Sequence, residues 1–343
     1  MRWFSPAPTP RPLQLALQGG GAHGAFSWGV LDALLEDGGL SFEAVSGCSA
    51  GAMNAALLAQ GLMEGGREGA RAALARFWGA LAASMPPQLT RELPEGGAAL
   101  SPLASLMLHW THYLGPEQLN PLDLNPLRDI LLQQLDFERL RRAAPLRLYL
   151  SATEANSGRL RLFRETELSA EVLLASACLP SVYRAVDIEG QAFWDGGYAA
   201  NPAIAPLVFE GRAPDLLLVL LSPLQHAQTP RTAAEIRQRT LELSFAAGFL
   251  SEMRLLARLR RAQVGRPWAL LDPASRRLAR CCFHLVEAGE VLGALPADSK
   301  LVVQERFFEQ LRDLGRARAQ AWLARHRGDL GRRSSADLQA LFG

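Results

Sequence analysis

Lysine is almost missing from this sequence of 343 residues. Lys300 is the only lysine, although lysine and arginine together number 36, so nearly every basic residue is an arginine. The arginines are spread along the chain, which indicates the composition of a genome more than a basic binding surface. With a formal net charge of +2, nothing points to a strongly charged partner, and we expect no nucleic acid among the partners.

Cysteine is scarce as well. The four cysteines have neither the paired spacing of a zinc site nor that of a disulfide framework. Cys281 and Cys282 are adjacent and cannot easily bridge each other, and the overall usage suits a reducing cytosol. We therefore expect neither a bound metal nor, from the motifs described below, an organic cofactor.

Long apolar runs are also absent. No stretch approaches the roughly 18 apolar residues of a membrane-spanning helix, and the densest run, 216–221, has the length of a strand. Residues 1–12 are rich in proline and lack the apolar core of a secretory signal, so we expect a loose lead-in and a cytoplasmic location. Apolar residues make up 49% of the chain, enough for a full core in one large domain or two ordinary ones.

What the chain does contain is a strand–turn–helix pattern that occurs twice near its N-terminus. Residues 13–18 favour a strand that runs directly into the glycine-rich stretch 19–24, and a helix with apolar residues at helical spacing follows. A second short strand over 42–45 is followed by an apolar helix from residue 50. Alternating strands and helices predict a mostly parallel sheet with helices on both faces.

The second of these patterns contains the residues around which we expect the site to form. Gly47, Ser49 and Gly51 match G-x-S-x-G, with Ser49 at the corner between strand and helix. Such a corner is sharp and strained, and it exposes the serine hydroxyl on top of the sheet. The helix N-terminus beneath it supplies unpaired N–H groups and a positive dipole end.

The rest of the chain predicts further elements around this opening. The proline-rich segment 84–126 has an exposed-looking apolar block over 103–113, which favours a lid or a substrate-facing cap. We expect helices over 62–83, 127–142 and 170–177, hairpins over 146–163 and 182–194, a last buried strand over 216–221, and mostly helix beyond residue 230.

The glycine-rich stretch can complement Ser49 in acyl transfer. A serine hydroxyl needs a base to accept its proton, and the reaction also needs donors aimed at the developing oxyanion. Because glycines lack Cβ atoms, the backbone N–H groups of Gly19, Gly20 and Gly21 can approach an anionic oxygen closely. Both loops follow adjacent parallel strands, so we expect them to lie side by side.

The same glycines allow a rival interpretation. Gly19, Gly21 and Gly24 match the dinucleotide fingerprint G-x-G-x-x-G between a strand and a helix. That fingerprint requires an acidic residue at the end of the next strand, whereas Glu36 and Glu43 precede that end. A dinucleotide site would also leave the G-x-S-x-G motif without a role.

Asp195, which begins the sequence Asp-Gly-Gly, is a candidate partner of Ser49. In a hydrolase triad with the order Ser, Asp, His, the histidine would be His226, which follows the run over 216–221, or His284, which looks like a helix position. In a dyad, Asp195 contacts Ser49 directly and is itself the base. A carboxylate is a weak base unless burial raises its pKa, and the aromatic residues around Asp195 favour such burial.

These motifs together resemble those of the patatin-like phospholipase family. The resemblance rests on QGGGAHG at 18–24, GCSAG at 47–51 and DGG at 195–197, which occur in the family's order. The stretches over 175–180 and 201–202 are similar to the family as well.

The resemblance implies a three-layer α/β/α sandwich with a mostly parallel central sheet. The catalytic domain would cover 13–225, with 84–126 as a lid or cap, and an Arg-rich helical region over 226–343 would pack on it. The implied activity is hydrolysis of carboxylic esters of lipids, as by a phospholipase A, lipase or esterase, without a metal. By position, the nucleophile would be Ser49, the general base Asp195, and the oxyanion loop Gly19, Gly20 and Gly21.

Two positions depart from the family's pattern. Many members carry an acid in place of Gln18 and a cation in place of His23, where the cation steadies the glycine loop or meets a phosphate head group. His23 would do so only when protonated, so neutral esters stay open beside phospholipids as substrates. Ala50 and Gly196, next to the two candidate catalytic residues, are further candidates for supporting the site.

The C-terminal region offers a different class of function. Residues 252–280 are rich in arginine, with Glu252 and Asp272 as the only acids, and a cationic helix can lie on an anionic lipid surface. Aromatic residues are sparse there, which counts against stacking on single-stranded nucleic acid. A lipid-surface-binding protein with an inactive hydrolase core is therefore the alternative, and peripheral membrane contact and oligomeric state stay open.

Overall fold

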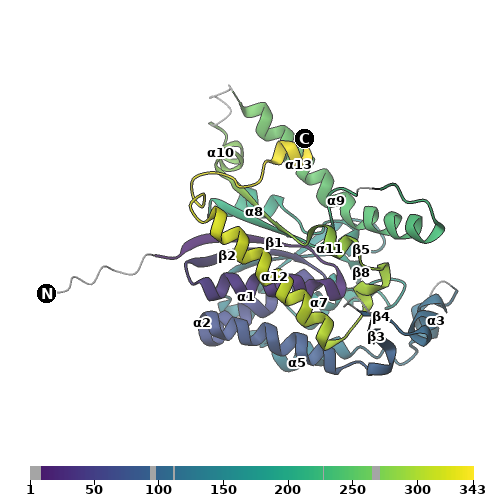
Figure 1. Ribbon diagram of the computed structural model, residues 1–343. Coiled ribbons are helices and arrows are strands. Elements are labelled where there is room, and N and C mark those ends of the chain that lie inside the picture. Colours follow the sequence, from purple (N-terminus) through teal and green to yellow (C-terminus); the bar gives the residue numbers. More distant parts are fainter. Residues whose placement is uncertain (1–8, 93–97, 111–112, 227, 265–270) are drawn as a thin grey trace.

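One mixed β-sheet of eight strands lies at the centre of the protein (Figure 1). The computed structural model describes residues 9–92, 98–110, 113–226, 228–264 and 271–343. The strand order is β10-β9-β1-β2-β5-β8-β7, and β6 also pairs with β5. The strands are β1 (Arg11–Leu17), β2 (Leu40–Cys48), β5 (Arg147–Glu154), β6 (Leu160–Arg164), β7 (Val186–Ile188), β8 (Gln191–Asp195), β9 (Asp215–Leu220) and β10 (Cys282–Glu287).

Strands β10, β9, β1, β2 and β5 run parallel to one another. Strands β6 and β8 each pair antiparallel with β5, and β7 pairs antiparallel with β8. Strand β1 lies between β2 and β9, and its residues Leu13, Leu15 and Leu17 are fully buried. A parallel strand that is covered on both faces is a continuous apolar run. The mostly parallel sheet predicted from the alternating strands and helices is confirmed.

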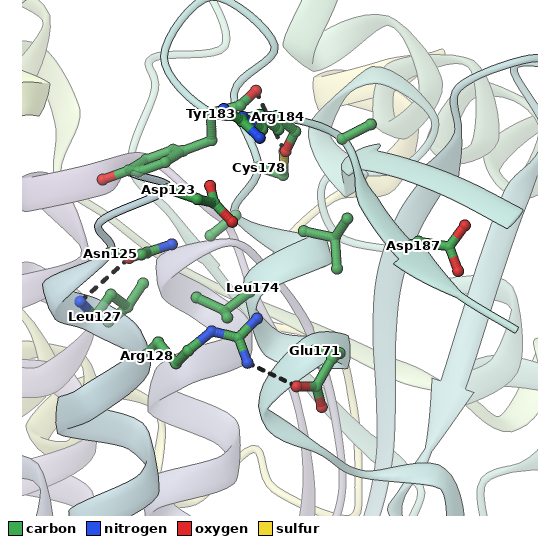
Figure 2. A pocket seen from close by; sticks show the side chains of 13 residues that line it. Asp123, Asn125, Leu127, Arg128, Glu171, Leu174, Cys178, Tyr183, Arg184 and Asp187 are labelled. Carbon is green, nitrogen blue, oxygen red and sulfur yellow. Dashed lines mark hydrogen bonds and ion pairs between the residues drawn. The ribbon is translucent and has the colours of Figure 1, made fainter. Parts of the chain in front are cut away.

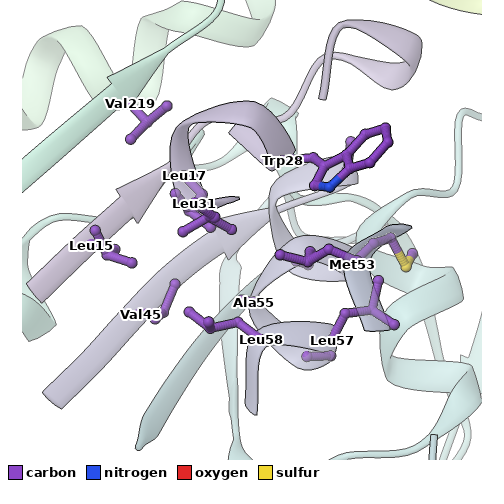
Figure 3. Packing of buried hydrophobic residues seen from close by; sticks show 14 of the residues in the cluster. Leu15, Leu17, Trp28, Leu31, Val45, Met53, Ala55, Leu57, Leu58 and Val219 are labelled. Carbon is purple, nitrogen blue, oxygen red and sulfur yellow. The ribbon is translucent and has the colours of Figure 1, made fainter. Parts of the chain in front are cut away.

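Helices cover both faces of the sheet, which confirms the α/β/α layers and the helical C-terminal region. One face carries α1 (Gly24–Asp37), α2 (Ala50–Ala83), α5 (Pro126–Gln134) and α12 (Glu305–His326). Figure 3 shows apolar side chains of α1 and α2 packed on Leu15, Leu17 and Val45 of the sheet. The other face carries α8 (Ala205–Glu210), α9 (Ala233–Gln263), α10 (Pro273–Arg280) and α13 (Leu338–Phe342).

Helix α12 packs along α1, although nearly the whole chain separates them in sequence. At Gly29 the carbonyl group of Arg312 leaves no room for a side chain. At Gly315 the carbonyl group of Phe26 has the same effect. The C-terminal region is therefore joined to the core by close backbone contact.

Strand β10 comes after the strand over 216–221, which the sequence indicates as the last one. Strand β10 pairs in parallel with β9 and forms an edge of the sheet, so the region beyond residue 225 is not entirely helical. His284, which we expected at a helix position, lies on β10. A strand of six residues is too short for periodicity to distinguish it from a buried helix segment.

The helix expected over 127–142 is two helices. Helix α5 ends at Gln134, and α6 (Phe137–Ala143) begins after Asp136, whose carboxylate accepts the Arg139 N–H at 2.9 Å. This N-cap starts a new helix and explains the break. Both expected hairpins are present, but the second begins at β7 and not at residue 182, because residues 182 and 183 turn back onto the Leu179 carbonyl.

Short elements complete the chain. The described residues of 84–126 form η2 (Pro87–Leu89), β3 (Thr90–Glu92), β4 (Ala98–Leu100), α3 (Pro102–Trp110) and α4 (Pro116–Leu119). The apolar side chains of Leu106, Met107 and Trp110 on α3 are exposed, and their role in a lid or at a lipid surface stays a prediction. The remaining elements are η1 (Gly21–His23), η3 (Glu165–Glu167), α7 (Ala170–Ser176), η4 (Gly196–Tyr198), α11 (Gly289–Gly293) and η6 (Ala297–Leu301).

Candidate active site

Ser49 lies at the turn from β2 into α2. Its backbone has φ 52° and ψ −123°, a conformation that residues with side chains rarely adopt and that costs about 1–3 kcal/mol. Side chains would not fit at the flanking glycines: a Cβ atom at Gly47 would lie 2.6 Å from the Gly51 carbonyl oxygen. The Ser49 N–H donates to Ser176 Oγ at 2.9 Å, so the strained corner is held from outside.

Ser49 and Asp195 lie together at this edge of the sheet: both line one cavity, and the Ser49 side chain favours the ionised form of the Asp195 carboxylate. Asp195 ends β8, and the pairing of β8 with β5 brings it to the carboxyl end of β2. Its Oδ1 also accepts the Gly197 N–H at 2.7 Å and the Cys48 thiol at 3.4 Å. The Asp195 side chain is buried, and the histidine side chains that the structure describes pair with other residues.

Burial raises the pKa of Asp195 to about 6, against hydrogen bonds that favour the ionised form. A carboxylate with this pKa is ionised at neutral pH, and it accepts a proton more readily than an ordinary aspartate. The apolar setting expected around it is present: Phe193 is buried, and the Tyr198 ring packs on Phe245 of α9.

The glycine loop lies beside Ser49, since a Cβ atom at Gly19 would be 2.8 Å from Ser49 Cβ. The Gly19 N–H donates to Asn201 Oδ1 at 2.6 Å, so it is not free to hold an oxyanion. Within the described part of the chain, the N–H groups of Gly20 and Gly21 have no acceptor. The expected loop of three donors is therefore corrected to two, with Gly19 as their anchor.

The two supporting candidates have different surroundings. Ala50 opens α2, where the first N–H groups have no partner within the helix, and none of the described residues accepts its N–H, which is a third donor beside Ser49. Gly196 follows Asp195 and packs on the Ser151 carbonyl, where a side chain would not fit. Gly196 thus allows β8 to lie close to β5.

His23 is buried and neutral. Burial, helped by the nearby Lys300 ammonium, lowers the pKa of His23 to about 3. The protonated state that a cationic role requires is therefore not reached at neutral pH, and that role is excluded. His23 Nε2 instead shares a hydrogen bond of 2.8 Å with Ser299 Oγ.

A positive charge near the loop comes from Lys300 of η6. Lys300 lines the same cavity as Ser49, and within the described part of the chain its ammonium makes no hydrogen bond. Burial lowers the pKa of Lys300, and the Glu242 carboxylate opposes this effect. The Lys300 carbonyl occupies the place of a side chain at Gly21, whose φ of 57° also favours glycine.

Neither histidine proposed for a triad contacts Asp195 in the structure. His226 Nε2 lies 3.3 Å from Glu242 Oε2, and His284 Nε2 lies 3.0 Å from Asp215 Oδ1. The Ser49 side chain, by contrast, adjoins the Asp195 carboxylate and opposes the rise of its pKa.

The acidic residues give the dinucleotide interpretation no support. Glu36 pairs with Arg71 and Arg316, and Glu43, near the start of β2, pairs with Arg147. Neither carboxylate is left free to meet a ribose beside the glycine loop.

A cavity of about 710 Å³ is lined by Ser49, Asp195 and the glycine loop, a size within the range of ligand pockets. Helix α9 and residues of η6 form part of its wall, whereas none of the described residues of 84–126 line it. The larger apolar side chains around it are Met53, Phe77, Trp78, Leu81, Leu127, Leu179, Val182, Tyr198, Leu241, Phe245 and Leu301.

A second hollow, of about 150 Å³, adjoins the first, since Leu127 and Ala177 line both. Figure 2 shows the ion pair between Arg128 and Glu171 at its edge, and Asp123 across from them. Charges of both signs line this hollow, so we assign no ligand to it.

Two residues that hold the site received no role in the sequence analysis. Ser176 accepts the Ser49 N–H, and Asn201 binds both the N–H and, at 3.3 Å, the carbonyl of Gly19. Both fall in stretches that resemble the family, and that likeness was the available signal.

All four cysteines are free and buried. Among the residues that the structure describes, no group of three or more His, Cys, Asp or Glu side chains could hold a metal ion. In that same part of the chain, no helix has both the length and the apolar character needed to cross a membrane.

A family model described as patatin-like phospholipase matches residues 15–208. No curated protein matches the chain. Among solved structures, VipD from Legionella pneumophila is 16% identical, with 91% of this chain and 68% of that chain covered and a TM-score of 0.37. ExoU from the type III secretion system of Pseudomonas aeruginosa, solved with SpcU, is 18% identical, with 80% and 53% covered and a TM-score of 0.29.

Proposed function

This chain belongs to the patatin-like phospholipase family, and on that premise we propose that it is a serine hydrolase acting on carboxylic ester bonds of lipids, as a phospholipase A, lipase or esterase. The observation that carries the proposal is the placement of Ser49 beside the buried Asp195 carboxylate, with both residues on the wall of one cavity. Family membership alone would not distinguish an active enzyme from an inactive relative, whereas this placement gives the nucleophile a base.

In the first step, Ser49 Oγ attacks the ester carbonyl carbon, and its proton passes to Asp195. The carbonyl oxygen becomes the oxyanion of a tetrahedral intermediate and accepts hydrogen bonds from the free N–H groups of Gly20, Gly21 and Ala50. Removing one such donor typically lowers kcat about 10²–10³-fold. Asp195 then gives the proton to the alcohol oxygen, which leaves as the acyl-enzyme forms.

In the second step, water hydrolyses the acyl-enzyme with the same two residues. Asp195 takes a proton from the water as its oxygen attacks the acyl carbonyl carbon. The new intermediate collapses, the fatty acid leaves, and the proton returns to Ser49 Oγ. This scheme needs no metal or organic cofactor.

The apolar cavity predicts a preference for long acyl chains. We expect kcat/KM for p-nitrophenyl esters to rise about fourfold with each added methylene until the cavity is full, because a buried methylene contributes about 0.8 kcal/mol. The measurement is hydrolysis of a series from short to long chains. On α9, Leu241→Trp is expected to shift the preference to shorter chains, since Leu241 lines the cavity, whereas Leu243→Trp, which does not, is the control.

Two outcomes would contradict the expected hydrolysis of long-chain esters. Equal rates at all chain lengths would show that the cavity does not hold the acyl group. A folded wild type that hydrolyses no ester would remove the proposed activity and favour the lipid-surface-binding alternative.

The ammonium group of Lys300 indicates which charge the head group of the substrate carries. Its ammonium has no hydrogen-bond acceptor in the described part of the chain, and a partly buried charge without a partner is unfavourable. Of the nearby carboxylates that line the cavity, Asp298 is half-buried, and Glu242 already pairs with His226 and Arg239. We therefore propose that preferred substrates carry an anionic group, such as a phosphate, near the scissile ester.

Replacing Lys300 tests this part of the proposal. We expect Lys300→Met to lower kcat/KM about 10–100-fold for phosphatidic acid, since a charge-assisted hydrogen bond contributes about 1.5–3 kcal/mol. For diacylglycerol with the same acyl chains, presented in the same mixed micelles, little change is expected. Lys300→Arg, which keeps the charge, is the control, and equal losses on both lipids would contradict a role in charge recognition.

A further inference from the structure

We propose that His23 and Ser299 are positioning residues that hold the glycine loop in the shape required for catalysis, an inference that rests on the proposed function. Their side chains are 276 positions apart in the chain, yet His23 Nε2 and Ser299 Oγ lie 2.8 Å apart. Both are buried, with exposed fractions of 2% and 0%. A segment far from the sequence motifs thereby becomes part of the active site.

The glycine loop is attached at both ends. At its start, Asn201 binds the N–H and the carbonyl of Gly19. At its end, the His23 N–H donates to the Gly20 carbonyl at 3.2 Å, and the His23 ring ties this turn to η6. The free N–H groups of Gly20 and Gly21 lie between the two attachments. Because glycine has the widest backbone freedom, the direction of these donors depends on both attachments.

Contacts on the outer side of the loop support this arrangement. The Lys300 carbonyl of η6 packs on Gly21, and β4 packs against η6. The ring of Phe307 meets the His23 ring edge-on, with centroids 6.3 Å apart. Because His23 is neutral, its hydrogen bond with Ser299 is not charge-assisted. The bond stabilises the turn by fixing the orientation of the His23 ring.

Loss of this hydrogen bond is expected to affect the chemical step more than substrate binding. A misplacement of about 1 Å can lower a rate about 100-fold, and Ser299 does not line the cavity that would hold the substrate. We expect Ser299→Ala to lower kcat at least about tenfold and to leave KM for a short-chain p-nitrophenyl ester within about twofold. Ser299→Cys keeps nearly the same volume but offers a weak donor, so an intermediate kcat is expected.

Ser335, which like Ser299 lies in the C-terminal part of the chain, provides a matched control. Its hydroxyl shares a hydrogen bond of 2.8 Å with His284 Nδ1 and accepts the Trp322 Nε1–H at 3.2 Å, on β10 and α12, away from the glycine loop. Ser335→Ala therefore also breaks a serine–histidine hydrogen bond of the same length. We expect it to lower the unfolding temperature while leaving kcat unchanged.

The experiment compares the wild type with Ser299→Ala, Ser299→Cys, Ser335→Ala and Ser49→Ala, well below their unfolding temperatures. Titration with a fluorophosphonate counts the active molecules, so kcat refers to each active site and a partly unfolded variant does not appear slow. Should Ser299→Ala fail to fold, Ser299→Cys preserves the packing and carries the test.

An unchanged kcat in the Ser299 variants, or an equal decrease in Ser335→Ala, would overturn the positioning role. In either case, activity that depends on Ser49 would leave the proposed function standing. Full activity in Ser49→Ala would instead overturn the proposed function itself, so the two failures are distinguishable.

Discussion

Replacing Ser49 with alanine is expected to lower kcat at least about 10⁴-fold, the largest loss that any single substitution in this chain should produce. The substitution removes the atom that attacks the ester, and among the described residues no other hydroxyl acts on the Asp195 carboxylate. The apolar walls of the cavity are not changed, so binding of a lipid to the variant should persist.

The measurement is ester hydrolysis by purified Ser49→Ala, together with mass spectrometry of the wild type after fluorophosphonate treatment, which should place the adduct on Ser49. Ser181→Ala is the control, because Ser181 lines the same cavity without contacting Asp195. Activity that survives in Ser49→Ala, or that is lost equally in Ser181→Ala, would contradict the assignment of the nucleophile.

Activity is expected to fall as the pH drops through about 6, the pKa to which burial raises Asp195. The general base must be ionised to accept the serine proton, so protonation below this pKa removes active enzyme and ionisation above it gives a plateau. Two pH units below the pKa, about 1% of the carboxylate is ionised, and kcat/KM should be about 100-fold below the plateau. A pH–rate profile on an ester without ionisable groups measures this.

Substitution of the same residue extends the test. Asp195→Asn is expected to lower kcat about 10²–10⁴-fold and to remove the dependence on pH near 6. His226→Ala should stay within about twofold of the wild type, since His226 pairs with Glu242 and not with Asp195. If His226→Ala is as inactive as Asp195→Asn, the enzyme uses a triad and the dyad is wrong.

The central part of the fold was predictable because its signals are local. The apolar run over 13–18, the glycines after it and the G-x-S-x-G corner each identify an element by neighbouring residues, and the parallel order of β1 and β2 follows from them. The proposed nucleophile and base were named from the same motifs. Ser49 and Asp195 line the same cavity, and the dyad that the family resemblance implies for them is part of the proposed function.

The residues around this centre were not predictable, because their contacts carry no local pattern. The hydrogen bonds of Ser176 and Asn201 with the site depend on loops that the sheet brings together. Strand β10 is too short to be recognised from its period, and the approach of Ser299 to His23 depends on the whole tertiary fold. An aspartate at 136 ended a helix that its apolar spacing alone would have continued.

The packing of α12 along α1 has a consequence for synthesis of the chain. Translation proceeds from the N-terminus, so the ribosome releases Ser49 and Asp195 before it has made η6 and α12. A nascent chain therefore contains Ser49 and Asp195 while α1 still lacks its contact with α12 and the His23 ring lacks its hydrogen bond with Ser299. If Ser299 positions the glycine loop as proposed, the site is completed only after residue 299 has been made.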